Sequence, residues 1–445
     1  MGLQRRLSLL HATALNTIDM VGIGPFIVMS SVMAAMGGPH CVIAWIAGAV
    51  LALTDAMVWA ELGAAFPDAG GSYAFLRRLY GSQRWGQVLS FLFIWQTVFQ
   101  SSFVVASGAI GFTNYVQYLM PLTSRWVTKA VAAGVIVLVV VALYRRIETI
   151  GKTSVALAVV VITTILWIVA SGIVGGNWSQ VAQIPRTFSL NGLGEAMQSS
   201  VYAILGYYNV CHLGAEVREP QRTIPRSMFL SIVLVTTLYI AMQLSVLSIV
   251  SPHQARPDQF IASIVVERVF GQTAAVIATV LVLVVALSSL YSVILGYSRI
   301  PYAAARDGNF FAIFARLHPT EHFPHISLLA IGALSILIVL IFDGLRIVVA
   351  SILTLRILVQ FVGQAIGLLL YHRRKGWAEF PFRMWFYPLP ALVAIMMWLW
   401  LFLSRPPVAI ANGTLALIAG VVVYVVVARQ NGWFPWNVER STDCE

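Results

Sequence analysis

Runs of about twenty apolar residues recur along the whole chain, and they restrict its fold more than any other feature. About twelve such runs occur, centred near residues 24, 50, 100, 133, 163, 204, 239, 286, 334, 359, 395 and 418. The composition agrees, because 59% of the residues are hydrophobic, 10% are charged and the mean hydropathy is +0.84. In hydrocarbon the backbone must satisfy its own hydrogen bonds, which a helix does within one segment. We therefore expect an all-α integral membrane protein with about twelve transmembrane helices.

The first of these runs carries helix-breaking residues at its centre. Gly22, Gly24 and Pro25 lie close together in the apolar segment 15–30. Proline lacks an N–H group and clashes with the preceding turn, and glycine weakens a helix further. Glycine alone in a membrane helix usually serves close packing, but the added proline favours a real interruption. An interrupted membrane helix leaves backbone groups that a substrate or an ion commonly occupies.

The sixth run repeats this anomaly. Gly206, Tyr207, Tyr208 and Asn209 lie in its middle, where helix propensity is low and polar groups gather. Two interrupted spans that lie five spans apart indicate an inverted repeat of five helices each. The expected units are the first repeat in residues 1–175, the second repeat in 190–372, two further spans in 384–430 and a cytoplasmic tail in 431–445.

The formal net charge of +11 reflects where the basic residues lie. With a cytoplasmic N-terminus, 20 of the 28 lysines and arginines fall in cytoplasmic segments, 7 fall outside and Arg356 lies within a span. This is the positive-inside bias of membrane proteins. It explains the basicity without a nucleic-acid partner. It predicts a multi-pass protein of the cell inner (plasma) membrane, embedded in the lipid bilayer with both termini cytoplasmic.

Three stretches give the chain a resemblance to a known family. Residues 59–73 read WAELGAAFPDAGGSY, residues 213–226 read LGAEVREPQRTIPR and residues 296–308 read GYSRIPYAAARDG. In this order, they resemble motifs of the amino acid–polyamine–organocation transporter superfamily, and of its bacterial-type amino acid permeases. The resemblance implies the LeuT-type fold, with two inverted repeats of five helices, here followed by two extra helices. It also implies transport of amino acids.

By this resemblance, the two interruptions form the substrate site. The family's usual G-S-G-I-F loop corresponds to residues 22–26, where Ile23 replaces the serine and Pro25 removes one N–H group. The N–H groups of Ile23 and Gly24, at the positive end of a half-helix, are then expected to hold the α-carboxylate of the substrate. Backbone carbonyls of both interruptions are expected to receive its α-ammonium group, near Met20, Tyr202, Ala203 and Leu205. The expected substrate-binding residues are Met20, Gly22, Ile23, Gly24, Tyr202, Ala203, Leu205, Gly206, Tyr207 and Tyr208.

Tyrosines supply most polar side chains of the second interruption. Tyr202 lies four residues before Gly206, where the family keeps a bulky aromatic gate. Tyr207 and Tyr208 follow the glycine and are expected to line the side-chain pocket. Tyrosine is also common at helix contacts and membrane interfaces, so a packing role stays open for all three. The pocket is otherwise apolar, which favours a neutral, hydrophobic or aromatic substrate side chain.

Polar residues inside spans are the candidates for coupling transport to an ion, either H+ or Na+. Asp19 could hold a cation, relay a proton, recognise a basic substrate or cap frayed N–H groups. Many proton-coupled or exchanging relatives carry a lysine partway along span 5, where this chain has Ile162 or Thr163. Hydroxyl groups of spans 5 and 8 could instead line a sodium site. The candidate coupling residues are Asp19, Thr163, Thr164, Ser288 and Ser289.

The remaining intramembrane charges carry weaker expectations. Asp55, Glu61 and Glu216 lie toward cytoplasmic ends of spans and are expected to be structural. Arg356, in span 10, needs a carboxylate or carbonyl partner that the sequence does not identify.

Other functional classes find little support in the sequence. No nucleophile elbow, phosphate loop or metalloprotease signature occurs, so we expect neither catalysis nor a cofactor. His318, His322 and His325 are separated by prolines that break any common helical face, so no metal site is expected. We interpret the chain as a secondary active transporter of amino acids that works by alternating access. The alternative in the same fold is a carrier of polyamines or other organic cations, with Asp19 binding the amine.

Overall fold

The computed structural model describes residues 4–435 of the protein, except residues 83, 123, 145–146, 183–189, 252–259, 343–355, 406 and 434. Within these residues the fold is helical, with only two isolated β-bridges and no strand. The expectation of an all-α protein is thus confirmed.

The helices follow the apolar runs of the sequence. The first third contains α1 (Leu9–Met20), α2 (Gly24–Met36), α3 (Cys41–Ala65), α4 (Ser72–Tyr80), α5 (Trp85–Leu119), α6 (Arg125–Leu143), α7 (Ile147–Gly175) and α8 (Trp178–Ala182). The middle contains α9 (Leu190–Ile204), α10 (Asn209–His212), η1 (Gly214–Glu216), α11 (Pro220–Ile249), α12 (Ile261–Phe270), α13 (Gln272–Arg306), η2 (Ala312–Ala315) and α14 (His325–Ile341). The last part contains the π-helix η3 (Ile357–Gly363), α16 (Gln364–Lys375), α17 (Leu389–Leu403) and α18 (Pro407–Asn431).

Many of these helices are long and apolar enough to cross a bilayer. In the described part of the chain seven helices qualify alone, and α1 with α2 forms an eighth span that bends by 48°. The helices α14 and α17 are shorter but equally apolar. All the centres expected from the sequence fall within helices, so the expectation of a multi-span membrane protein is confirmed.

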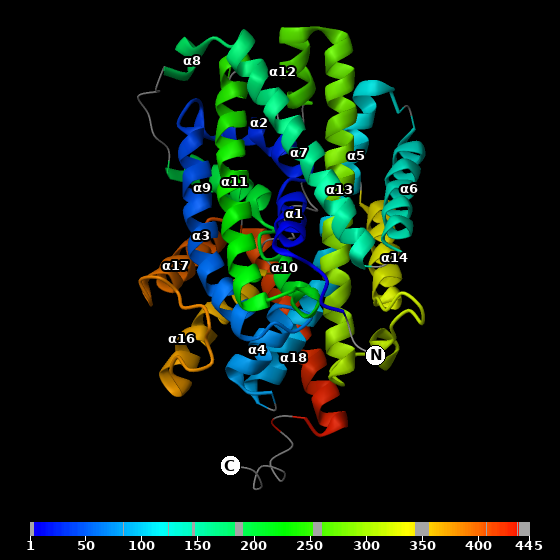
Figure 1. Ribbon diagram of the computed structural model, residues 1–445, viewed down its shortest axis with the longest axis vertical. Coiled ribbons are helices and arrows are strands. Elements are labelled where there is room, and N and C mark those ends of the chain that lie inside the picture. The colour runs from blue at the N-terminus through cyan, green and yellow to red at the C-terminus, as the bar shows by residue number, and fades with distance from the viewer. Residues whose placement is uncertain are drawn as a thin grey trace.

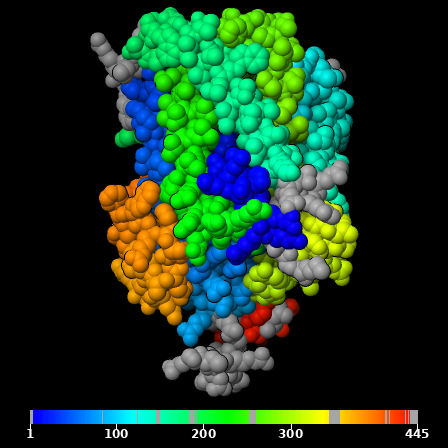
Figure 2. All heavy atoms as spheres, viewed as in Figure 1, coloured from blue at the N-terminus to red at the C-terminus, as the bar shows by residue number. Residues whose placement is uncertain are grey.

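The interrupted helices lie at the centre of the molecule. Figure 1 shows α1 between α11 and α13, and the contacts of α1 with α7, α11 and α13 agree. The half-helix α2 packs on α9, which brings the two interrupted spans together. In the space-filling view the deep-blue N-terminal residues emerge on one face beside the green of α11 (Figure 2).

The three stretches that resemble family motifs meet at the end of the molecule where α4 lies (Figure 1). Ala69 and Leu213 form a β-bridge between the first and second stretches. Glu216 of the second stretch forms a buried ion pair with Arg299 of the third, with 2.8 Å between Oε1 and Nε. A Cβ at Gly70 would lie 2.8 Å from Cβ of Ala303, so only glycine permits this approach of the first stretch to the third. The three motifs therefore contact one another at this end of the molecule.

Two other carboxylates expected to be structural are likewise buried and bonded. Glu61 Oε1 lies 3.0 Å from His372 Nε2. Asp55 accepts hydrogen bonds from Tyr207 and Trp398. The division into two inverted repeats stays a prediction, although both interruptions occur where it requires them.

Candidate functional site

The first interruption separates α1 from α2 over three residues. The helix α1 ends at Met20, and the N–H of Val21 still donates to Thr17 O at 2.9 Å. The helix α2 begins at Gly24, so Pro25 lies in its first turn, where a missing N–H costs no helical hydrogen bond. Among the described residues, the N–H groups of Gly22, Ile23 and Gly24 donate to no protein acceptor. They form a set of free donors at a helix N-terminus.

The second interruption touches the first. The helix α9 ends at Ile204, and Gly206 has φ +121°, a conformation that side chains disfavour. A Cβ at Gly206 would lie 2.7 Å from Oδ2 of Asp19 and 2.9 Å from N of Met20. Glycine is therefore required here for both backbone conformation and close approach.

Hydrogen bonds from buried side chains fasten the two interruptions to each other and to α11. Oδ1 of Asn16 accepts from the N–H of Val210 at 2.9 Å. The hydroxyl of Tyr239, on α11, donates to the carbonyl of Met20 at 2.9 Å and lies 3.4 Å from that of Ala203. Sequence reasoning missed Tyr239, because nothing local distinguishes it from other tyrosines in apolar helices. The two carbonyls expected to receive an ammonium group thus already share one donor, and each keeps a second lone pair.

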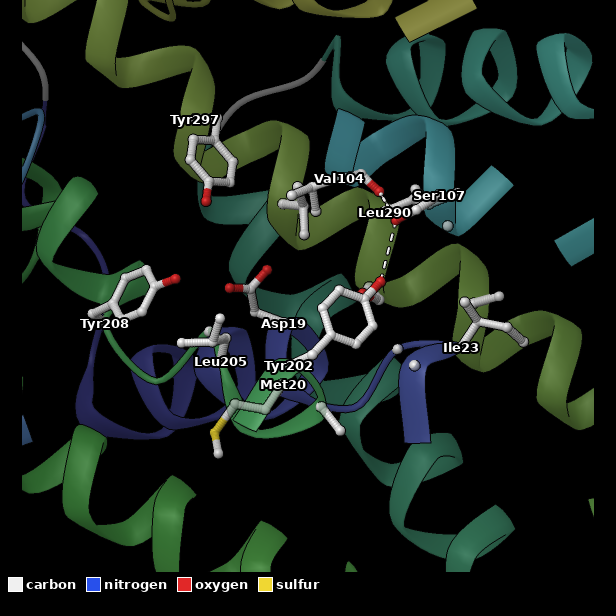
Figure 3. Close-up of a pocket in the computed structure, with 18 of the residues that line it drawn as sticks. Asp19, Met20, Ile23, Val104, Ser107, Tyr202, Leu205, Tyr208, Leu290 and Tyr297 are labelled. Atoms are coloured by element: carbon white, nitrogen blue, oxygen red, sulfur yellow. Dashed lines mark hydrogen bonds between the residues drawn. The ribbon is translucent and has the colours of Figure 1, made fainter. Parts of the chain in front are cut away.

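A cavity lies against both interruptions, and residues of α1, α2, α5, α9 and α13 line it. The lining residues expected from the sequence are Asp19, Met20, Gly22, Ile23, Gly24, Tyr202, Ala203, Leu205, Gly206, Tyr208 and Ser289. The lining residues that sequence reasoning did not name as part of the site are Val104, Ser107, Gly108, Ala286, Leu290, Val293, Tyr297 and Arg356. Figure 3 shows the carboxylate of Asp19 projecting between the rings of Tyr202 and Tyr208.

Tyr207 does not line this cavity, contrary to expectation. Its hydroxyl donates to Oδ2 of Asp55 at 2.5 Å, and Nε1 of Trp398 donates to Oδ1 of the same carboxylate at 3.2 Å. The chain turns tightly after Gly206, so consecutive side chains leave it in different directions. Tyr208 faces the cavity, and Tyr207 packs toward α3 and α17.

Tyr202 spans one side of the cavity. Its hydroxyl lies 3.2 Å from Oγ of Ser107 on α5, which joins α9 to α5 (Figure 3). A Cβ at Gly24 would lie 3.2 Å from Cε1 of its ring. The position suits a gate, and the gate role stays a prediction.

The hydroxyls expected to line a sodium site have different surroundings. Ser289 lines the cavity, but Thr163 is exposed on α7. Thr164 donates to Val160 O at 2.8 Å, and Ser288 donates to Val285 O at 2.7 Å, each within its own helix. The sodium site therefore gains no support from these side chains.

Arg356 brings a positive charge into the cavity. It is 2% exposed, and its Nε donates to Oε1 of Gln360 at 2.9 Å. Its Nε thus pairs with an amide oxygen one turn ahead, and the guanidinium also interacts electrostatically with the carboxylate of Asp19 and with Tyr208. The i, i+4 spacing of arginine and glutamine was a signal in the sequence that could have identified this pair.

Comparisons with known proteins match most of the chain to membrane transporters. A family model described as amino acid permease matches residues 7–428. The chain is 28% identical over 394 residues to a mouse protein named cationic amino acid transporter 4, covering 83% of this chain and 58% of that relative. It is 24% identical over 451 residues to the methylthioribose transporter of Bacillus subtilis, covering 96% and 94% of the two chains. It is 26% identical over 352 residues to human solute carrier family 7 member 13, covering 74% and 72%. The chain therefore spans little more than half the length of the mouse relative.

Proposed function

Because the chain belongs to the amino acid permease family, we propose that it is a secondary active transporter that moves amino acids across the cell inner membrane by alternating access. The substrate binds in the cavity between the interrupted helix pairs α1–α2 and α9–α10. The observation that carries this proposal is the row of N–H groups at residues 22–24, which donate to no acceptor among the described residues, beside a cavity that both interruptions line.

The α-carboxylate of the substrate binds at the first interruption. The N–H groups of Ile23 and Gly24 lie at the start of α2, where the helix dipole favours an anion. Glycine at residue 24 leaves the backbone here uncovered by a side chain, and an added Cβ would lie 3.2 Å from Cε1 of Tyr202. The ligand can therefore approach the N–H groups themselves.

The α-ammonium group binds beside the same interruption. Oδ1 of Asp19 is buried and has no hydrogen-bond partner in the described part of the chain, and Asp19 lines the cavity. Met20 and Ala203, whose carbonyls each keep a second lone pair, line the same cavity. A zwitterionic backbone thus meets donors on one side and acceptors on the other.

Alternating access requires contacts that open in turn on the two sides of the cavity. The Tyr202–Ser107 contact joins α9 to α5 on one side. The Glu216–Arg299 pair joins η1 to α13 at the end where the motifs meet. The transport cycle opens one contact while the other stays closed. Both termini of the chain lie in the cytoplasm. The coupling ion is H+ or Na+.

Binding of free amino acids to the purified protein tests this proposal directly. The thermal stability of the full chain is measured with each of the twenty amino acids and with common polyamines, since a ligand of the folded state raises stability. We expect stabilisation by one or more amino acids, lost in the Gly24→Leu variant. Stabilisation by polyamines alone would contradict the proposal.

The second candidate is a carrier of polyamines or other organic cations. It is favoured by the oxygen of Asp19 that has no hydrogen-bond partner among the described residues. Arg356 lines the same cavity and opposes a second cation there, so we rank this candidate below amino acid transport.

A further inference from the structure

Arg356 places a positive charge in the cavity. In the proposed binding mode, neither the α-carboxylate nor the α-ammonium group of the substrate pairs with it. Resting on the proposed function, we propose that Arg356 selects amino acids whose side chain ends in a planar oxygen acceptor, a carboxylate or a carboxamide. Arg356 is thus a specificity-determining residue, and the substrate class shifts from apolar side chains to acidic and amide side chains.

The guanidinium of Arg356 is held in place by its neighbours. Its Cζ lies 5.2 Å from the ring centroid of Tyr208, 5.6 Å from that of Phe361 and 5.9 Å from that of Tyr297. Phe361 in turn stacks on Trp398 with 4.0 Å between ring centroids. Cation–π contacts of this kind are strongest where water is excluded. The side chain is therefore oriented before a ligand arrives.

One nitrogen of this guanidinium is left for a ligand. Nη2 of Arg356 is buried and has no hydrogen-bond partner among the residues that the structure describes, while Nε donates to Gln360. A buried charged donor without an acceptor is costly, because its lost hydration is not replaced. The residue also lies at the start of a π-helix, a distortion that occurs often at functional sites. Both observations point to a ligand acceptor at Nη2.

In the proposed binding mode, other groups of the site bind the α-carboxylate and the α-ammonium group of the substrate, so Arg356 faces the side chain of the substrate. The free N–H groups of residues 22–24 take the α-carboxylate, and Asp19 takes the α-ammonium group. An apolar side chain would leave Nη2 unpaired, and a cationic one would face a like charge. A carboxylate or carboxamide oxygen completes the hydrogen bonding of arginine, which suits planar oxygen acceptors.

A panel of amino acids of similar length tests the inference on the wild-type protein. Dissociation constants for glutamate, glutamine, methionine and lysine are measured by calorimetry on the full chain. We expect glutamate or glutamine to bind at least about tenfold more tightly than methionine and lysine, since a site built for hydrogen bonds rejects ligands that lack them. Methionine or lysine binding as tightly as both oxygen-bearing ligands would overturn the inference.

Variants of the arginine then separate recognition from folding. In Arg356→Met the dissociation constant of the preferred ligand should rise at least about tenfold, with that of methionine changed by less than about threefold. Gln360→Leu leaves Nε of Arg356 without its partner. We expect this variant to reduce the preference for the oxygen-bearing ligand over methionine, but by a smaller factor than Arg356→Met does. Arg383→Met is the matched control, because Arg383 also packs on an aromatic ring: its Cζ lies 5.9 Å from the ring centroid of Trp377. Arg383 is exposed and does not line the cavity.

The outcomes distinguish this inference from the function on which it rests. If methionine binds but oxygen-bearing side chains bind no better, the inference fails and amino acid transport stands. If Arg356→Met and Gln360→Leu weaken all ligands equally, Arg356 only supports the structure, and the inference fails. If the wild type binds no amino acid, both fail.

Discussion

The ring of Tyr202 lies directly over Gly24, so that a Cβ at residue 24 would be 3.2 Å from Cε1 of the tyrosine. The first interrupted helix and the second thus meet where the substrate carboxylate is proposed to bind. Replacement of Gly24 by leucine would push the ring aside and fill the approach to the N–H groups. We expect Gly24→Leu to abolish amino acid binding while the protein remains folded.

The control for this variant is Gly134→Leu, because Gly134 is exposed on α6 and an added Cβ there meets nothing within 4 Å. Both variants are purified, and their melting temperatures and ligand binding are compared. Normal ligand binding by Gly24→Leu would show that the carboxylate binds elsewhere.

Asp19→Asn should weaken the binding of every amino acid to a similar extent. The change removes the negative charge proposed to pair with the α-ammonium group, which all amino acids share. We expect dissociation constants to rise at least about tenfold. Calorimetry with several ligands checks this, and an effect confined to cationic ligands would instead support the polyamine candidate.

Tyr202→Ala should slow transport more than Tyr208→Ala does. The first variant removes the contact with Ser107 that we propose to close one side of the cavity, whereas the second enlarges the pocket and should change which side chains fit. Tyr202→Phe, which loses only the hydroxyl, should be intermediate. The measurement is uptake into liposomes with a panel of amino acids, and equal effects without a change of preference would argue against a gate.

The buried pair of Glu216 and Arg299 gives a prediction about stability. Both side chains are 2% exposed, so Glu216→Ala leaves an uncompensated charge among packed helices. We expect a loss of about 3–5 kcal/mol, partly recovered when Arg299 is also replaced by methionine. Denaturation of the single and double variants measures this, and a double variant less stable than Glu216→Ala would contradict it.

The orientation in the membrane can be tested with single cysteines. Arg78 lies on α4 with 64% of its side chain exposed, and Arg125 begins α6 on the other side of a long span. In a variant without the native cysteines, Arg125→Cys should react with an impermeant maleimide in intact cells. Arg78→Cys should react only after the membrane is permeabilised, and the reverse pattern would place the termini outside.

Local chemistry made the two interruptions predictable, because glycine and proline act on their own backbone whatever surrounds them. The apolar runs likewise placed the helices. The roles of Tyr207 and Tyr208 could not be separated, since the turn after Gly206 follows neither helical nor strand periodicity. Tyr239 acquires its role from segments far away in the chain, and the sequence carries no local sign of those neighbours. The pairing of Arg356 with Gln360 was visible in the i, i+4 spacing, but its place in the cavity beside Asp19 and Tyr208 was not.

Thr163 illustrates a different limit. Its chemistry suited a sodium ligand, but its exposure depends on which face of α7 packs inward. In an apolar membrane helix, the face toward lipid and the face toward the protein interior are similar in sequence, because both surroundings favour apolar side chains.

The single hydroxyl of Tyr239 reaches the last carbonyl of α1 and a carbonyl of the final turn of α9. A hydroxyl has only one hydrogen, so the two half-helices depend on the same atom for their hydrogen bonding. Pulling them apart would strand polar oxygens in a region with no water to replace the donor. The hydroxyl of Tyr239 thus holds both half-helices to α11. Under the proposed alternating access, α1 and α9 would therefore move together with α11 when the cavity opens.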